Sequence, residues 1–126
     1  MNASDSTPTP DPQVLDLAVI DGLRELGGEE DPQLLFELIE LFLEDAPARL
    51  AEMEEALDTQ NLDGMRRAAH TLKSSSANMG AVTFSQLCRD LEAAARASDA
   101  SAFRQKHGSC RGAYQAFEAE LRRLRD

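Results

Sequence analysis

The sequence predicts an all-α protein, an antiparallel four-helix bundle of the up-and-down kind with a short extra helix at its N-terminus. Three observations support this fold class. Apolar residues recur at intervals of three and four, as they do on the buried side of a helix. No segment alternates apolar and polar residues as a strand does. Residues that start and stop helices separate the periodic segments by short loops, which favours antiparallel neighbours.

We expect one domain, because 126 residues suffice for a single core without disulfides or metal. Residues 1–12 are rich in Pro, Ser, Thr and Asp. They carry too little apolar surface to offset the entropy of ordering, so we expect a disordered tail there. The bundle is expected to occupy residues 13–126.

The first two helices are predicted from their end signals. A short helix is expected over 14–26, and Gly27–Gly28 ends it. Asp31–Pro32 supplies an N-cap and a first-turn residue for a second, longer helix. Pro47 predicts a kink or a restart of that helix near Asp45. The expected buried positions of the second helix are Leu35, Leu38, Phe42, Ala46, Leu50, Met53 and Leu57.

Three further helices complete the predicted bundle. Asn61 is the expected N-cap of the third helix, which ends at Gly80. Thr83, followed by Gln86 three residues later, fits a capping box at the start of the fourth. Ser98 is expected to begin the last helix. The inward positions of these last two helices are Phe84, Leu87, Cys88, Leu91 and Ala95, and then Phe103, Cys110, Phe117, Leu121 and Leu124.

The formal charge of −10 is unevenly distributed along the chain. Residues 1–60 hold 16 acidic and 2 basic side chains, whereas residues 61–126 hold 7 acidic and 11 basic ones. An acidic total argues against nucleic acid as the partner, because phosphate contacts need a basic face. The basic half suggests an anionic partner surface or a small phosphate, with ordinary solvated helix faces as the alternative.

The two cysteines and the hydropathy pattern indicate the compartment. Cys88 and Cys110 lie in helical segments without metal-ligand spacing, so we expect buried hydrophobic side chains in a reducing compartment rather than a disulfide. No apolar run is long enough to span a membrane, and the N-terminus lacks the regions of a signal peptide. We expect a soluble, cytoplasmic monomer without a metal site.

The segment "RRAAHTLKSSSANMG", residues 66–80, carries the most informative pattern. At 100° per residue, His70 lies well away from the core stripe of the third helix. It is flanked by Arg66 and Arg67 one turn earlier, and by Lys73 and Ser74 one turn later. The imidazole is therefore expected on a positively charged outward face. The core stripe itself is Leu62, Met65, Ala69, Leu72, Ser76 and Met79.

Beyond the histidine the outward side chains are small, among them Ser74, Ala77 and Asn78. They leave a low surface on which a second protein can approach the imidazole closely. The alternative is a solvated helix face whose serines bond back to backbone carbonyls. An outward histidine, a lysine three positions on and small residues beyond it together favour a docking site.

The stretch "AAHTLKSSSANMGA" resembles the signature of the histidine phosphotransfer (HPt) domains of bacterial multistep two-component relays. That pattern runs His, any residue, Leu, Lys, Gly and small residues, with Gly-Ala one turn later. The resemblance extends from about Val14 to the C-terminus, through "FLEDAPARLAEM" and "LCRDLEAAAR". The usual glycine after the lysine is Ser74 here, which leaves access to the histidine but makes docking tighter or more selective.

The resemblance implies a phosphocarrier. His70 is the implied acceptor, with Nε2 as nucleophile, between a receiver-domain aspartyl phosphate and another receiver aspartate. Glu92, 22 positions on, is implied to hold the Nδ1 proton, and Lys73 to meet the phosphoryl oxygens. Arg66 and Arg67 are implied to attract the acidic mouth of the receiver, where the Mg²⁺ of the reaction belongs. Response-regulator receivers and an upstream hybrid histidine kinase are the implied partners.

Other functions are less well supported by the residues. Neither a Walker loop nor a kinase glycine loop occurs, so we expect no autokinase activity, no cofactor and no enzyme in the usual sense. Ser74 beside Lys73 lacks the strand-turn-helix elbow of a hydrolase. His107 lies near the core stripe of the last helix and is expected to be a packed or rim histidine. The remaining alternative is a bundle of the same fold that binds a receiver or kinase without carrying phosphate.

Overall fold

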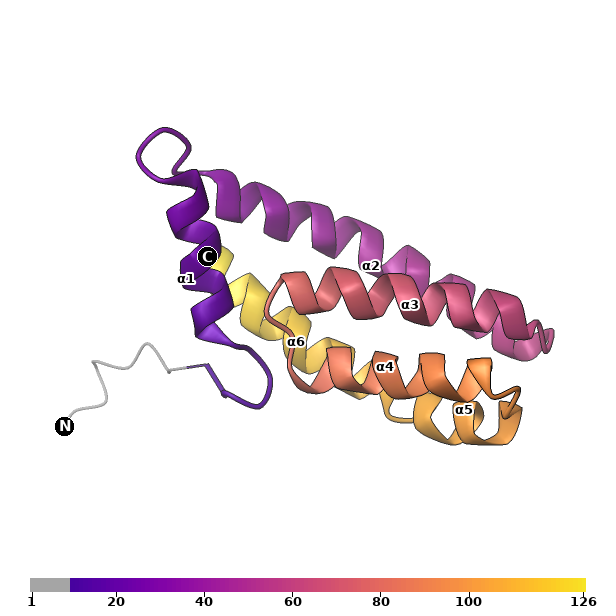
Figure 1. Cartoon of the computed structure of the whole chain (residues 1–126). Helices are drawn as coiled ribbons and strands as arrows, with labels where there is room; N and C mark the ends of the chain where they lie inside the picture. Colours follow the sequence, from indigo (N-terminus) through magenta and orange to yellow (C-terminus); the bar gives the residue numbers. More distant parts are fainter. Residues whose placement is uncertain (1–9) are drawn as a thin grey trace.

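A computed structural model describes residues 10–126, which form six α-helices (Figure 1). Four of them, α2, α3, α4 and α6, run side by side in alternating directions, while α1 crosses one end of the bundle. The predicted all-α antiparallel bundle with an extra N-terminal helix is confirmed. No helix in this part of the chain combines the length and apolarity needed to cross a membrane. The helices are α1 Leu17–Gly27, α2 Leu34–Asp58, α3 Leu62–Asn78, α4 Thr83–Arg96, α5 Ala100–His107 and α6 Cys110–Arg125.

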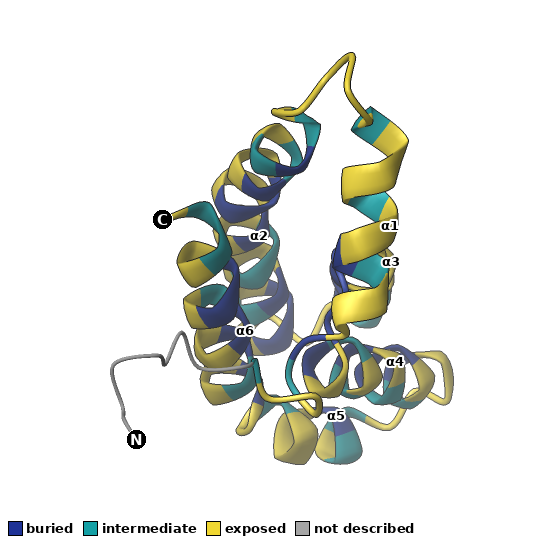
Figure 2. Ribbon diagram, turned by 90° about the vertical axis from the view of Figure 1, so that its left-hand side faces the viewer, coloured by how far each residue is buried: buried dark blue, intermediate teal, exposed yellow. Residues whose placement is uncertain are grey.

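Aromatic side chains from three helices fill the centre of the bundle. Phe42 of α2 meets Phe117 of α6 edge to face, with ring centroids 5.5 Å apart. Phe84 of α4 meets Tyr114 of α6 at 5.4 Å in the same way. Such pairs add to the stabilisation from apolar burial. Figure 2 shows the buried residues on the inner sides of the helices, whereas α1 is exposed along most of its length.

The start of the chain is tied to the bundle. Of the predicted tail 1–12, residues 1–9 lie outside the described part of the structure. The next residues lead into a turn in which the Gln13 amide donates to Asp11 Oδ1 at 2.9 Å. The Asp11 amide donates to Glu120 Oε2 of α6 at 3.3 Å.

The helix predicted over 14–26 begins later, at Leu17, and this part of the prediction is wrong. Asp16 is the N-cap, and its carboxylate accepts a hydrogen bond from the Ala18 amide at 2.9 Å. The residues before it pair instead with the loop after α3. The Val82 amide donates to Val14 O at 3.1 Å, and the Asp16 amide donates to Gly80 O at 2.8 Å. Partners far along the sequence therefore replace the first helical turn.

The second helix also differs from its prediction at two points. It begins at Leu34 rather than at Asp31–Pro32, and its N-cap Gln33 makes no side-chain capping bond. It then runs unbroken through Pro47 to Asp58, so the predicted restart is wrong. Pro47 is exposed, so its ring removes one backbone donor from the solvent side of the helix without ending it.

The predicted capping box of the fourth helix is wrong. Val82 occupies the N-cap position of α4 in a helical conformation and makes no side-chain capping bond. The Thr83 hydroxyl donates instead to Gln13 O at 2.6 Å, so the N-terminal segment satisfies it. Gln86 donates from its amide side chain to Asp90 one turn further along α4.

The predicted last helix is two helices. Its start is at Ala100 rather than at Ser98, because Ser98 has a φ of 57° and Asp99 supplies the cap to Ala102 N at 3.0 Å. The chain breaks again at Gly108–Ser109 between α5 and α6. Gly108 is poorly suited to a helix interior. The predicted core positions in the two helices that this break separates, Phe103 in α5 and Cys110 in α6, are both fully buried.

Cys88 and Cys110 are buried free thiols, as predicted. Burial raises the pKa of both thiols, that of Cys110 to about 11, because the thiolate is disfavoured away from water. These cysteines therefore behave as small core side chains.

We predict that Gly80→Ala destabilises the fold by about 1–3 kcal/mol in urea unfolding. Gly80 has a φ of 87°, and an added Cβ would lie 3.0 Å from Asp16 O. Gly22→Ala in the middle of α1 is the matched control, because no described atom lies within 4 Å of the added Cβ. It should raise stability by about 0.5–1 kcal/mol. A gain in stability for both variants would contradict the strain at Gly80.

Candidate functional site

The outward position of His70 follows from how α3 is built. Asn61 caps the helix as predicted, with its side-chain oxygen accepting from Gly64 N at 3.0 Å. The core stripe predicted for this helix is buried, except that Leu62 is only partly buried. His70 lies on the opposite side, and its side chain is 52% exposed.

Glu92 of α4 reaches the histidine from the neighbouring helix. Its Oε2 lies 2.8 Å from His70 Nδ1. The Glu92 side chain is only 5% exposed, so it is not an ordinary surface glutamate. α3 and α4 pack closely together, which brings these two residues into contact although 22 positions separate them in sequence.

Two cations share the same carboxylate. Lys73 Nζ lies 2.7 Å from Glu92 Oε1. Arg96, one turn further along α4, donates to Glu92 Oε2 from Nη2 at 3.0 Å and from Nε at 3.3 Å. Arg96 was not among the predicted site residues, although its i,i+4 spacing from Glu92 is the spacing of a helical ion pair. The structure thus gathers His70, Lys73, Glu92 and Arg96 into one cluster.

The hydrogen bonds keep Glu92 ionised. Burial by itself raises the pKa of a carboxyl group. Here hydrogen bonds from Lys73, Arg96 and His70 outweigh that effect and lower the pKa of Glu92 to about 2. A carboxylate has no proton to donate, so the His70 nitrogen that faces it must carry the hydrogen. In the neutral ring Nε2 then holds the lone pair, on an imidazole that is half exposed.

Arg66 and Arg67 do not contact this cluster in the structure but pair with Asp63. Arg66 Nη2 lies 2.9 Å from Asp63 Oδ1, and Arg67 Nε lies 3.3 Å from Asp63 Oδ2. The hydrogen bond from Arg66 and the charge of Arg67 lower the pKa of Asp63 below its usual value. Their positive charge is therefore partly offset on the helix itself.

The small residues after His70 are divided between two environments. Ser74, Ala77 and Asn78 are exposed, as the docking interpretation requires. The hydroxyls of Ser75 and Ser76 bond back to carbonyls three residues earlier, at 3.4 Å each. These two serines thus show the back-bonding of the alternative interpretation, but Ser76 is buried in the core rather than on a solvated face.

His107 lies outside the Glu92 cluster. Its ring stacks on Phe103 at a centroid distance of 6.4 Å and an interplanar angle of 12°. It lines a hollow of about 310 Å³ between α2 and the α5–α6 junction. This is the packed or rim position predicted for His107.

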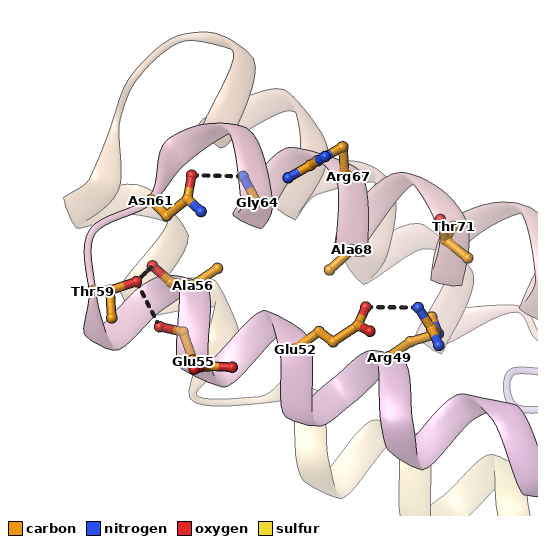
Figure 3. A pocket seen from close by; sticks show the side chains of 10 residues that line it. All are labelled: Arg49, Glu52, Glu55, Ala56, Thr59, Asn61, Gly64, Arg67, Ala68 and Thr71. Carbon is orange, nitrogen blue, oxygen red and sulfur yellow. Dashed lines mark hydrogen bonds and ion pairs between the residues drawn. The ribbon is translucent and has the colours of Figure 1, made fainter.

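A larger hollow of about 590 Å³ lies between α2 and α3 (Figure 3). Its α3 side includes Gly64, Ala68 and Thr71, and Arg67 stands at its edge. It adjoins the histidine helix without including His70. Within residues 10–126, no group of three or more His, Cys, Asp or Glu side chains is arranged to hold a metal ion.

The fold and the site define a class of protein: a helical bundle that presents one oriented imidazole to the surface. The sequence matches the Hpt domain family over residues 37–126, and the chain belongs to that family. The resemblance noted from the motif around His70 is thus confirmed. Family membership supports histidine phosphotransfer in a phosphorelay as the function.

Two proteins with phosphotransfer or phosphorelay names are similar to this chain. The crystal structure of histidine-containing phosphotransfer protein B from Pseudomonas aeruginosa PAO1 superposes with a TM-score of 0.80, at 27% identity over 95% of this chain and 96% of that one. Multistep phosphorelay regulator 1 of Schizosaccharomyces pombe is 26% identical over 82 residues. That match covers 65% of this chain but only 28% of the yeast protein.

We predict that Glu92→Gln removes a pH-dependent part of the stability. Because the folded pKa lies below the unfolded one, the ionised Glu92 stabilises the fold above about pH 5 and loses this effect as the pH falls towards 2. The difference in unfolding free energy between wild type and Glu92→Gln should therefore narrow by about 2 kcal/mol over that range. Chemical unfolding of both proteins at a series of pH values measures this difference. If the unfolding free energies of wild type and Glu92→Gln changed in parallel with pH, the lowered pKa of Glu92 would be contradicted.

Proposed function

We propose that this chain is a histidine phosphotransfer protein whose phosphoacceptor is His70. It takes a phosphoryl group from the aspartyl phosphate of a receiver domain and passes it to the aspartate of another. The observation that carries the proposal is the hydrogen bond between the half-exposed His70 and the buried carboxylate of Glu92. This contact leaves Nε2 as the outward nucleophile.

The transfer balances without a general base on this chain. The Nε2 lone pair of His70 forms a bond to phosphorus while the bond from phosphorus to the receiver's aspartate oxygen breaks, and the carboxylate leaves with that electron pair. The proton on Nδ1 stays in place. The ring becomes positively charged, and the carboxylate of Glu92 stabilises it, as the aspartate of a hydrolytic triad does. Transfer to the second receiver reverses these steps.

Lys73 has a role in this mechanism that depends on an exchange of partners. In the absence of phosphate it lies 2.7 Å from Glu92 Oε1. A phosphoryl group with a charge of about −1.5 to −2 on His70 competes for this ammonium group. Arg96 holds the other oxygen of Glu92 and keeps the carboxylate paired when Lys73 turns outward. Lys73 then offsets the charge of the phosphoryl oxygens during transfer.

The remaining proposals concern partners and setting. Receiver domains of response regulators and an upstream hybrid histidine kinase are the partners that this chemistry requires, and Mg²⁺ belongs to the receiver's pocket. Ser74, Ala77 and Asn78 provide the low surface for docking. The chain acts as a phosphocarrier in the cytoplasm, without an autokinase activity of its own.

We predict that His70→Gln folds normally but accepts no phosphoryl label from a phosphorylated receiver. The side chain is half exposed, so its replacement changes little packing. His107→Gln is the matched control and should retain transfer, because His107 lies outside the Glu92 cluster. Each variant is mixed with a phosphorylated receiver domain, and the acid-labile, alkali-stable phosphoryl label that it acquires is measured. A receiver that binds wild type without ever labelling it would favour the alternative, a non-phosphorylated adaptor.

We predict that Ser74→Gly speeds transfer and broadens the range of receivers. Its hydroxymethyl group stands on the exposed surface next to the imidazole and narrows the space for a docking helix. The substitution should lower stability by about 0.5–1 kcal/mol. Transfer rates to several receivers for wild type, Ser74→Gly and Ser74→Ala provide the test. Slower transfer in both variants would show instead that the hydroxyl contacts the phosphoryl group.

A further inference from the structure

Asp63 lies on the outward side of α3, seven residues before His70, and binds both arginines of that face. Each of its carboxylate oxygens takes a different guanidinium, Oδ1 that of Arg66 at 2.9 Å and Oδ2 that of Arg67 at 3.3 Å. The Asp63 side chain is 63% exposed, so water and a partner protein can reach the cluster. These pairs run along one helix at i,i+3 and i,i+4 spacing and therefore do not hold helices together.

The pairing decides where the two guanidinium groups stand. Side chains on a helix lean towards its N-terminus, and Asp63 draws both arginines further in that direction. In Figure 3 the guanidinium of Arg67 points along α3 towards Gly64 and away from Thr71, the neighbour of His70. The pairing with Asp63 thus holds the two charges at the N-terminal end of the histidine surface, by which we mean the outward face of α3 formed by His70, Lys73, Ser74, Ala77 and Asn78.

We propose that Asp63 is a specificity-determining residue of the docking surface, because it competes with the acidic groups of an incoming receiver for Arg66 and Arg67. The inference rests on the proposed function, in which the partner is a receiver domain, and on the acidic mouth that the family resemblance implies for that receiver. A receiver whose carboxylates match both guanidinium positions displaces Asp63. A receiver whose acidic groups do not match these positions leaves both arginines paired with Asp63, so the arginines add nothing to its affinity.

Two consequences follow for the encounter with a receiver. The aspartate lowers the positive potential beside His70 and therefore slows electrostatically steered association. It also penalises poorly matched receivers more than matched ones, since repulsion of the wrong partner is one source of specificity. Both effects act between exposed charges, so salt should weaken them.

The test compares association rates without phosphate. Asp63→Asn and wild type are mixed in a stopped-flow instrument with two purified receiver domains, the tightest and the weakest binder of the source organism. At about 0.01 M salt, where the Debye length is about 30 Å, Asp63→Asn should associate about three- to tenfold faster. The gain should be larger for the weak binder and should vanish at about 1 M salt.

Two controls separate this role from a general charge effect. Glu118→Gln removes an acidic partner of Arg122 at i,i+4 on α6, outside the histidine surface, and should leave the association rates near wild type. In a chain that already carries Arg66→Gln and Arg67→Gln, the substitution of Asp63 should change the rates by less than about twofold. The thermal unfolding midpoint of each variant shows whether unfolding of the substituted helix accounts for any change in the association rate.

Three results would overturn the proposal: equal rates for Asp63→Asn and wild type, an equal gain for Glu118→Gln, or a full gain that persists without the two arginines. Failure of this proposal can be distinguished from failure of the phosphocarrier assignment, because association is measured without phosphate. Failure of His70 labelling with a salt-dependent Asp63 effect would leave the docking role in place. Normal labelling with no Asp63 effect would reject the docking role alone.

Discussion

The histidine site depends on a buried, ionised carboxylate at the contact between two helices. Taking a charge out of water is costly unless hydrogen bonds and opposite charges replace the water. For Glu92 these come from Lys73 and His70 on α3 and from Arg96 on its own helix, α4. Any shift between the helices would leave the carboxylate short of donors. The same carboxylate therefore fixes the proton position on His70 and links α3 to α4 through its contacts with His70 and Lys73.

Much of the fold was predictable because helical periodicity and bundle packing follow from local patterns. The errors fall where a distant part of the chain or the side of a helix decides the outcome. Thr83 looks like a cap in sequence, but its hydroxyl is satisfied by Gln13, 70 residues away. Pro47 looks like a break, but it lies on the solvent side of α2 and the helix continues through it.

The candidate site divides in the same way. The outward position of His70 and its neighbours on α3 follow from 100° per residue. The contact with Glu92 does not, since it depends on how α4 packs against α3, and only the resemblance to a family indicated it. The pairs of Asp63 with Arg66 and of Glu92 with Arg96 lie within one helix at ordinary spacing. Spacing alone predicts that both pairs can form. It does not predict that Glu92 is buried beside His70, whereas Asp63 stays exposed on the surface.

The four cations named around the histidine are already paired with carboxylates of the chain itself. Lys73 and Arg96 share Glu92, and the two arginines of the rim share Asp63. In the proposed transfer, binding of a phosphoryl group or of an acidic receiver is therefore an exchange of partners rather than the filling of a free cationic site. The exchange is limited at Glu92, where the buried carboxylate must keep at least one cation, and Arg96 allows Lys73 to leave. The exchange is easier at Asp63, because this side chain is exposed and water can hydrate its carboxylate once the arginines leave. One face of α3 thus combines a tightly constrained exchange beside the proposed phosphoacceptor His70 with a loosely constrained one at Asp63, where the proposed partner docks.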